Sequence, residues 1–570
     1  MATSTLEAPT GDIANRYADL EARIMDRDQQ AASDVLYDLV RDGRPLEEML
    51  RETIRVHAPY TQAPYHQRID DGMVRFVNND HCLLSARASL RLPGVLPASM
   101  RFLPMAQTMW YVPTGLDAWS QLLGKAPGHY GRRVYDESKY PNPPAPTRHW
   151  ADGDPIMTEG TLDDRLNHWL TLVQMGQVDE SYGVFQGLLT NPAERPEVLA
   201  QLMFAGLIDV QDRIYMNRSY TTGHKSYRAR ATIELSNAVG WENAHDIIYA
   251  GVPDIAVGPR WHSAYEMACE VQLRRLEDEL PQSSLARTVI TGRDAELFAQ
   301  TDDLSSAEQA MLLHAILEQP EPAYMEAIIE LLLAGRSPKA ILDTIQIAAA
   351  EVVLRCGEGP SFSMPQHGYE YTNTLAWFYA NFEHKHKTKL LFIAGSFINQ
   401  TARWVRDSPG NGKVVFRAPA AASGMSRDQL LGQLDGAMAS LRPDESANWV
   451  QAYLDAGYDR RPLVGTLAFG ATKQGNDPHN QEIGLCMIED YGRTSSPFRD
   501  RLLLAAAKHT AGHSKYGDSL ESYNRFAREF GLPAAQGTSG EADPLQAVLD
   551  EMEQVPLAQE EAVPQGLMTN

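Results

Sequence analysis

The sequence predicts an all-α fold of repeated helical hairpins, about four diverged units that either close around a central pocket or form a short solenoid. Three observations predict it. Apolar residues recur at the i, i+3 and i+4 spacing of helices, glycine stops interrupt these patterns, and evidence for strands is thin. The best strand candidate is the short segment 413–417. The 570 residues are 43% hydrophobic, so the chain can bury a large core.

One pattern recurs along the chain: an amphipathic helix, a glycine stop and the start of a new helix. Glycine just past the last turn adopts the left-handed cap that other residues resist, and Ser, Asp or Pro then opens the next helix. The stops are Gly43, Gly206, Gly335 and Gly457. A histidine follows each stop after 23, 18, 32 and 22 residues, in that order: His66, His224, His367 and His479. The alternative is chance recurrence, since helical hairpins look alike and the chain has 16 histidines.

These units predict how the chain is organised. The parts are a disordered N-terminus (1–12), helical units at 13–114, 161–295, 296–417 and 418–531, a lid or excursion at 115–160, and a loose C-terminal tail at 532–570. The lid is rich in Pro, Gly, Tyr and charge, a composition typical of a long connection between units. The tail allows a short helix around residues 545–552.

Charge and cysteine usage exclude several classes. A net charge of −23 disfavours nucleic acid and anionic membranes as partners. No apolar stretch is long enough to span a bilayer and no secretory signal is visible, so we expect a cytoplasmic protein. The four cysteines are far apart and form no CxxC pair, which excludes a zinc ribbon, a c-type haem attachment site and a Rieske cluster on this chain. No GxGxxG or GxxxxGK(S/T) sequence stands at a strand-to-helix junction, and the GxSxG motif of many hydrolases is missing.

Several histidines stand three or four residues from a carboxylate or another histidine. On a helix this spacing places both side chains on one face, where they can share a metal ion. The pairs are Glu242 with His245, His262 with Glu266, His367 with Glu370, His479 with Glu482, and His509 with His513. Imidazole and carboxylate together suit iron, manganese or zinc, and a di-metal site needs about two such pairs from different helices. The alternative is plain hydrogen-bonded pairs on solvated faces.

Other polar residues are candidates for substrate contacts. Lys225 and Arg230 lie in the densest polar segment, 222–245, and we expect them to position substrate or an oxygen-derived anion. Tyr130 or Tyr135 in the lid would close the pocket. The alternative is a polar network between helices. The Met and aromatic residues of 105–111 suit either the core or a pocket for a flat organic molecule or haem.

Several segments of the sequence resemble those of a known protein family. They are Thr222-Gly-His-Lys225, Gly240-Trp-Glu-Asn-Ala-His245, Leu103-Pro-Met-Ala, residues 135–139, and His367 followed by Thr372-Asn373. The chain resembles a poorly characterised bacterial family of all-helical proteins, some of them joined to or found beside Rieske-type ferredoxins. It is also faintly similar to questin oxidase-like proteins, proposed ring-cleaving oxygenases. The resemblance covers most of residues 30–400, with His224, Lys225, His245 and His367 as matches. It implies an oxidative metal site served by a separate electron donor.

The leading expectation is a metal-dependent oxidoreductase, an oxygenase or monooxygenase acting on a small aromatic or polyketide-like molecule. Iron is the favoured metal, with manganese or zinc as alternatives. We expect a separate electron-transfer protein as partner and leave a homodimer open. The predicted metal ligands are His66, His224, Glu242, His245, His367, Glu370 and His479. Two alternatives are a non-enzymatic helical-repeat scaffold for a protein partner, which would leave its histidines exposed, and a haem-binding helical enzyme.

Overall fold

The structure, a computed structural model, describes residues 9–26, 28–58, 81–115, 153–208, 223–256, 299–357, 359–475, 477–513 and 519–533, with a few isolated positions besides. Within these ranges the chain is helical apart from loops and one isolated bridge between Asp302 and Arg336, which confirms the predicted all-α fold. The strand expected at 413–417 is wrong: these residues lie in irregular structure, and the backbone N–H of Arg417 donates to the side chain of Asn448.

The α-helices of the described residues fall into four successive groups of five, followed by one more helix. The first group is α1 (Gly11–Met25), α2 (Gln29–Arg41), α3 (Leu46–His57), α4 (Cys82–Arg91) and α5 (Leu103–Gly115); the second is α7 (Leu162–Gln174), α8 (Val178–Leu189), α9 (Arg195–Leu207), α10 (His224–Val239) and α11 (His245–Ala256). The third is α14 (Ser306–Glu318), α15 (Ala323–Leu333), α16 (Pro338–Leu354), α17 (Ser363–Asn381) and α18 (Lys387–Asp407); the fourth is α19 (Arg427–Ala439), α20 (Pro443–Asp455), α21 (Arg460–Lys473), α22 (Pro478–Arg493) and α23 (Asp500–Gly512), and α24 (Glu521–Phe530) follows.

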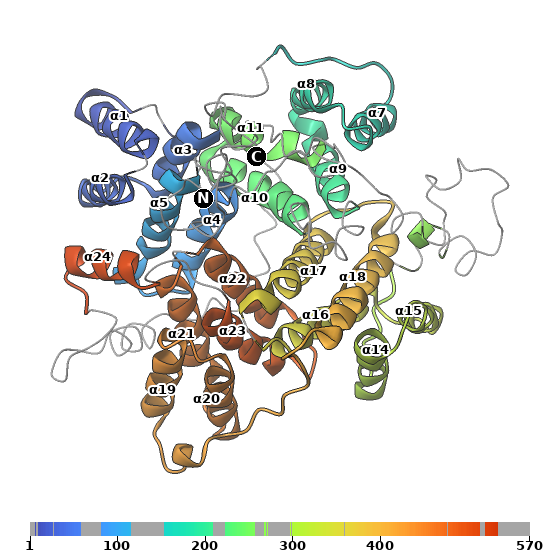
Figure 1. Cartoon of the computed structure of the whole chain (residues 1–570). Coiled ribbons are helices and arrows are strands. Elements are labelled where there is room, and N and C mark those ends of the chain that lie inside the picture. Colours follow the sequence, from blue (N-terminus) through green and yellow to red (C-terminus); the bar gives the residue numbers. More distant parts are fainter. Residues whose placement is uncertain are drawn as a thin grey trace, which may run out of the picture.

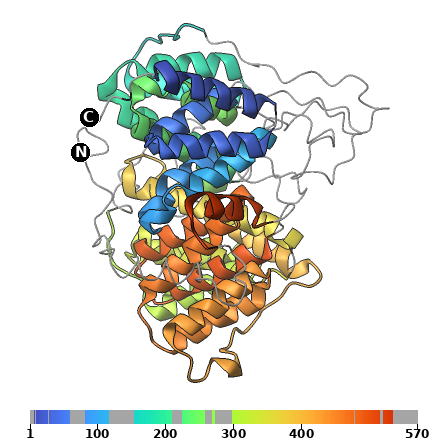
Figure 2. The ribbon, with the colours of Figure 1, turned by 90° about the vertical axis from the view of Figure 1, so that its left-hand side faces the viewer.

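The four groups share one order of packing. In each, the first helix contacts the second, the third contacts the fourth, and the fifth contacts both the second and the fourth. The helices of the first two groups occupy the upper half of the molecule in Figure 2, and those of the last two groups occupy the lower half. This common order is what four diverged copies of one unit would give, although the copying itself stays a prediction.

Three of the four glycine stops end a helix as expected. Gly43, Gly335 and Gly457 follow α2, α15 and α20 with φ values of +72°, +84° and +72°, the left-handed conformation that glycine adopts without strain. Near Gly206 the helix also ends, at Leu207, but Gly206 is the last residue but one of α9 and not a left-handed cap. A Cβ atom there would lie 3.0 Å from the carbonyl oxygen of Lys225, so Gly206 lets α9 approach α10 closely.

Four helices, one from each group, surround the middle of the molecule (Figure 1). They contact one another in a closed ring, in which α4 packs on α10, α10 on α17, α17 on α22, and α22 on α4. Each is the fourth helix of its group. A site at the centre of this ring can therefore receive side chains from all four parts of the chain.

A buried network of charges links these four helices. Arg87 of α4 lies 2.6 Å from a carboxylate oxygen of Glu234 on α10 and 2.6 Å from one of Glu489 on α22. Arg230 of α10 pairs with Glu489 at 3.0 Å and donates a hydrogen bond of 2.7 Å to Asn373 on α17. Both guanidinium groups are almost fully buried, so the carboxylates supply the charge balance that burial requires.

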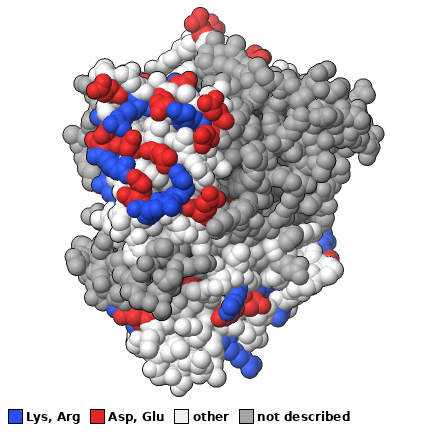
Figure 3. All heavy atoms as spheres, turned by 60° about the vertical axis from the view of Figure 1, so that its left-hand side comes forward, with Lys and Arg blue, Asp and Glu red and all other residues white. Residues whose placement is uncertain are grey.

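The outer surface carries charges of both signs. Figure 3 shows acidic and basic side chains interleaved over the face that α1, α2 and α3 form. Arg16 bridges to Asp38 and Asp42 there, and Arg55 bridges to Glu21. The negative net charge is therefore not gathered into a uniform patch on this face. In the part of the chain that the structure describes, no helix combines the length and the apolar character needed to cross a membrane.

Candidate metal centre

Four imidazole rings meet where the four central helices begin. His81 directly precedes α4, His224 opens α10, His479 is the second residue of α22, and His367 lies in the first turns of α17. The ring centre of His224 lies 4.8 Å from that of His81 and 4.5 Å from that of His367. The ring centres of His81 and His479 are 4.4 Å apart. The helix ring thus gathers one histidine from each quarter of the chain at a single place.

The ring nitrogens face one another in pairs. Nε2 of His224 lies 3.2 Å from Nε2 of His367, and Nε2 of His81 lies 3.1 Å from Nε2 of His479. Two imidazoles can share one proton at this distance. Two ligands at right angles on an ion with bonds of about 2.1 Å also lie roughly 3 Å apart. The observed spacing therefore suits shared binding of a cation as well as it suits a hydrogen bond.

Two carboxylates lie behind these rings. Both carboxylate oxygens of Glu370 lie within 3.1 Å of Nδ1 of His224. Asp477 contacts Nδ1 of His479 at 3.1 Å and Nε2 of His513 at 2.8 Å. A carboxylate in this position can accept the Nδ1–H of the imidazole, which leaves the lone pair on Nε2 for a metal ion, or it can bind an ion together with the imidazole.

Together these residues form three overlapping groups of metal-binding side chains. Within each group, one ligand atom from every residue lies within 4.8 Å of the others. The groups are His81, His224 and His479; His224, His367 and Glu370; and Asp477, His479 and His513. The second and third groups each combine two imidazoles with one carboxylate.

Burial keeps three of the imidazoles neutral. His81, His224 and His367 are buried, and burial lowers the pKa of each ring well below its usual value, with the neighbouring imidazoles acting in the same direction. A neutral ring retains the lone pair that a metal ion needs, whereas a protonated ring has none. At neutral pH the three rings are therefore in the form that binds metals.

The two carboxylates differ in charge state. Burial raises the pKa of Glu370 to about 8. Burial also acts to raise the pKa of Asp477, but His513 and His479 outweigh it and hold that pKa well below the usual value. At neutral pH Asp477 is thus ionised, while Glu370 carries a proton unless a cation takes its place.

Four of the seven expected ligands come together here: His224, His367, Glu370 and His479. Glu242 and His245 do not join them. Both are exposed and lie just beyond the C-terminal end of α10, whereas His224 is its first residue. A helix of 16 residues is about 24 Å long, so the two ends cannot share a site. His66 lies outside the described residues.

The cluster also contains residues that were not among the expected ligands. His81, Asp477 and His513 all join it. The helical pair His509 and His513 gave a signal for the last of these, but nothing in the sequence connected that pair to the other histidines. Asp477 is the N-cap of α22 and accepts a hydrogen bond from the backbone N–H of His479. Its place in the sequence therefore indicates the start of a helix and gives no sign of a metal ligand.

The residues expected to contact substrate are not among the metal-binding side chains of the cluster. Lys225 is buried beside His224, with its Nζ 3.4 Å from the carbonyl oxygen of Ile255. Arg230 belongs to the charge network of the four central helices, where carboxylates already balance it. Tyr130 and Tyr135 lie outside the described residues.

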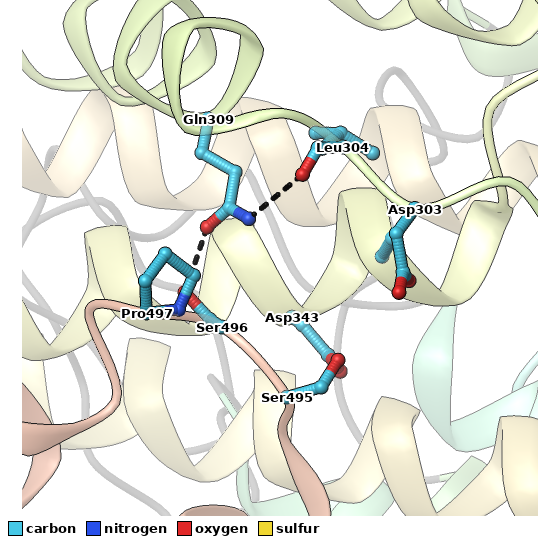
Figure 4. A pocket seen from close by; sticks show the side chains of 8 residues that line it. Asp303, Leu304, Gln309, Asp343, Ser495, Ser496 and Pro497 are labelled. Atoms are coloured by element: carbon cyan, nitrogen blue, oxygen red, sulfur yellow. Dashed lines mark hydrogen bonds between the residues drawn. The ribbon is translucent and has the colours of Figure 1, made fainter.

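A small hollow of about 90 Å³ is lined by residues that do not belong to the cluster, among them Gln309 and Ser496 (Figure 4). Gln309 crosses it, donating to the carbonyl oxygen of Leu304 and accepting from the hydroxyl of Ser496. Ser496 follows the C-terminal end of α22, whereas His479 stands at the N-terminal end of that helix. The hollow is therefore separate from the imidazoles.

The cluster offers a cation five imidazoles and two carboxylates inside the protein, which is a donor set for a transition metal. No protein-family model, curated protein or solved structure matches the chain. A proposal for the function of the chain therefore depends on the geometry of the cluster.

Proposed function

We propose that the chain is a metal-dependent oxidoreductase, an oxygenase that binds iron at His224, His367 and Glu370. The observation that carries the proposal is this buried set of two neutral imidazoles and one carboxyl group on two facing helices, α10 and α17. A set of two histidines and one carboxylate is typical of non-haem iron oxygenases. When bound, iron supplies the one-electron redox chemistry that oxygen activation needs.

The surrounding chain supports such a site. The three side chains are at most 5% exposed, so bulk water is kept from the donors. Glu370 gives up its proton when a cation arrives and then supplies the negative charge that balances the ion. All four cysteines are buried and none belongs to the cluster, so the thiolate donors of most structural zinc sites are absent from the described donor set.

The convergence of the imidazoles also favours an enzyme over a scaffold. A helical-repeat scaffold would present its histidines on the surface, whereas His224 and His367 face each other inside the molecule. Following the resemblance described above, we propose a small aromatic or polyketide-like substrate and a separate electron-transfer protein as the reductant.

The test is the metal content of protein purified without a histidine tag. We expect iron in the unaltered chain, and less iron in His224→Ala and in His367→Ala, with the helical content unchanged by circular dichroism. His245→Ala is the matched control, because it removes an exposed imidazole from the far end of α10; its iron content should equal that of the unaltered chain. Unchanged iron in both site variants would overturn the proposal.

A further inference from the structure

The iron site proposed above leaves four metal-binding side chains of the cluster unused: His81, Asp477, His479 and His513. Three of them form a second set of two imidazoles and one carboxylate. Oδ1 of Asp477 lies 3.1 Å from Nδ1 of His479, and Oδ2 lies 2.8 Å from Nε2 of His513. These are the separations expected of neighbouring ligands on one ion, roughly 3 Å apart.

The set of His224, His367 and Glu370 and the set of Asp477, His479 and His513 are neighbours, but they are too far apart to bind the same ion. The rings of His81, His224 and His479 form a triangle in which the ring centres are 4.8, 4.4 and 5.7 Å apart, so the two sets adjoin at these three rings. Among the described residues, no group of mutually close donor atoms combines His367 or Glu370 with Asp477 or His513. Ligands on opposite sides of one ion are only about 4.2 Å apart, twice a bond of about 2.1 Å. A single ion therefore cannot engage both carboxylates as the cluster stands.

We propose that the cluster is a dinuclear centre, in which Asp477, His479 and His513 hold a second ion and His81 contacts a histidine of each set. This inference rests on the proposed function, because it assumes the first ion at His224, His367 and Glu370. It deepens that function, since two iron ions would give the enzyme two one-electron centres in one site.

The placement of the second set fits this role. Asp477 and His479 come from the start of α22, and His513 comes directly after α23, which packs on α22. Asp477 is fully buried and His513 is 8% exposed. A carboxylate held inside the protein between two imidazoles is in a suitable place to neutralise a divalent cation.

The competing explanation is that Asp477 only orients His479. A carboxylate that accepts the Nδ1–H of a ligating imidazole fixes its tautomer without touching the metal. In that case the cluster holds one ion, and His513 merely supports Asp477. The two explanations predict different metal stoichiometries.

The experiment removes metal from the full chain, reloads it anaerobically with Fe²⁺ alone and measures iron per chain. We expect about two ions in the unaltered protein and about one in His513→Gln, whose amide can still donate a hydrogen bond to Asp477. His245→Ala, which lacks an exposed imidazole outside the cluster, should keep both ions. One ion in both the unaltered chain and His513→Gln would overturn the dinuclear centre while leaving the proposed function intact, and no bound iron at all would overturn both.

A second measurement needs no variant. The unaltered chain loaded with Mn²⁺ alone should give the electron paramagnetic resonance spectrum of an exchange-coupled pair, in which two ions share a bridge or lie a few ångströms apart. A spectrum of isolated Mn²⁺ ions at full loading would contradict the dinuclear centre.

Discussion

Glu370 is a carboxyl group enclosed by helices, and burial raises its pKa to about 8. Below that pH the metal-free protein holds a proton there, which a bound ion must displace. Metal binding at pH 7 should therefore release about one proton per chain, and the apparent affinity should rise with pH until about pH 8 and then level off. The neutral imidazoles add no further protons in this range, because their pKa values are lowered.

Calorimetric titration with Mn²⁺ in buffers of different ionisation enthalpy measures this release. Glu370→Gln should abolish it, because the amide has no proton to lose in this range. Binding at pH 7 without proton release from the unaltered chain would show that Glu370 is not ionised by the metal.

At the scale of residues, the sequence indicates donors that share a helix and misses those that the fold brings together. His367 and Glu370 stand three apart on α17, and that spacing was enough to suggest them. His81 and His479 are 398 positions apart, and Asp477 and His513 are 36 apart. Helical periodicity carries no information about such contacts, because they depend on how separate helices pack.

At the scale of elements, Gly223 positions the start of α10 against α17. It is the N-cap of α10 with φ of +83°, and a Cβ atom there would lie 2.6 Å from the carbonyl oxygen of His367 and 2.9 Å from Oε2 of Glu370. Gly335 has nearly the same backbone angle, φ of +84°, but no atom would lie within 4 Å of its Cβ. Substitution of Gly335 therefore tests backbone strain alone, whereas substitution of Gly223 tests backbone strain together with contact at the site.

We expect Gly335→Ala to lower the free energy of unfolding by about 1 kcal/mol, the usual cost of a left-handed alanine, and to leave the metal content unchanged. Gly223→Ala should cost a similar strain and in addition displace His224 and the α17 backbone from each other, so its metal content should fall. Metal analysis alongside urea unfolding separates the two effects. Full metal occupancy in Gly223→Ala would show that the spacing of α10 and α17 does not control the site.

The hairpins illustrate what local sequence can and cannot predict about an element. Gly43, Gly335 and Gly457 end their helices, as the pattern of an apolar stripe followed by glycine indicates. Gly206 follows the same kind of stripe, but it lies inside the last turn of α9, and its lack of a side chain allows α9 and α10 to approach closely. The sequence pattern is identical in the two situations, and only the neighbouring helix distinguishes them.

At the scale of the whole molecule, the charge network joins the four quarters of the chain at the central helices. Glu489 is shared by Arg87 and Arg230, so its removal leaves two buried guanidinium groups with less than their full charge balance. Glu489→Ala should lower the free energy of unfolding by about 3–5 kcal/mol, the usual cost of breaking a buried ion pair.

Urea denaturation measures this change. The control is Glu383→Ala, because the side chain of Glu383 is 97% exposed and its pair with Lys387 spans 3.6 Å; the expected loss there is about 0–1 kcal/mol. Equal losses in the two variants would show that the network does not hold the central helices together.

Metal binding should also stabilise the molecule as a whole. The proposed ligands come from more than one quarter of the chain, and an ion that binds only the folded state adds its binding free energy to folding. The thermal midpoint of metal-free protein should therefore rise as Mn²⁺ is added. His224→Ala should show a smaller rise than His245→Ala, and equal rises in the two variants would place the stabilising ion elsewhere.

The all-α class and several hairpin turns could be predicted from periodicity and capping, because these depend on residues close together in the chain. The closed ring of α4, α10, α17 and α22 could not, since no local pattern specifies which helices become neighbours. The cluster of imidazoles depends on that ring of helices, so the sequence predicts only part of the cluster.

The central claim is that imidazoles from separate helices hold a metal ion inside this ring. Anomalous diffraction at the iron absorption edge, from crystals of protein reloaded with Fe²⁺, tests it most directly. The account predicts an anomalous peak in contact with His224, His367 and Glu370. Fully loaded crystals with the only iron peaks at the protein surface, and with these side chains bonded solely to one another, would contradict it.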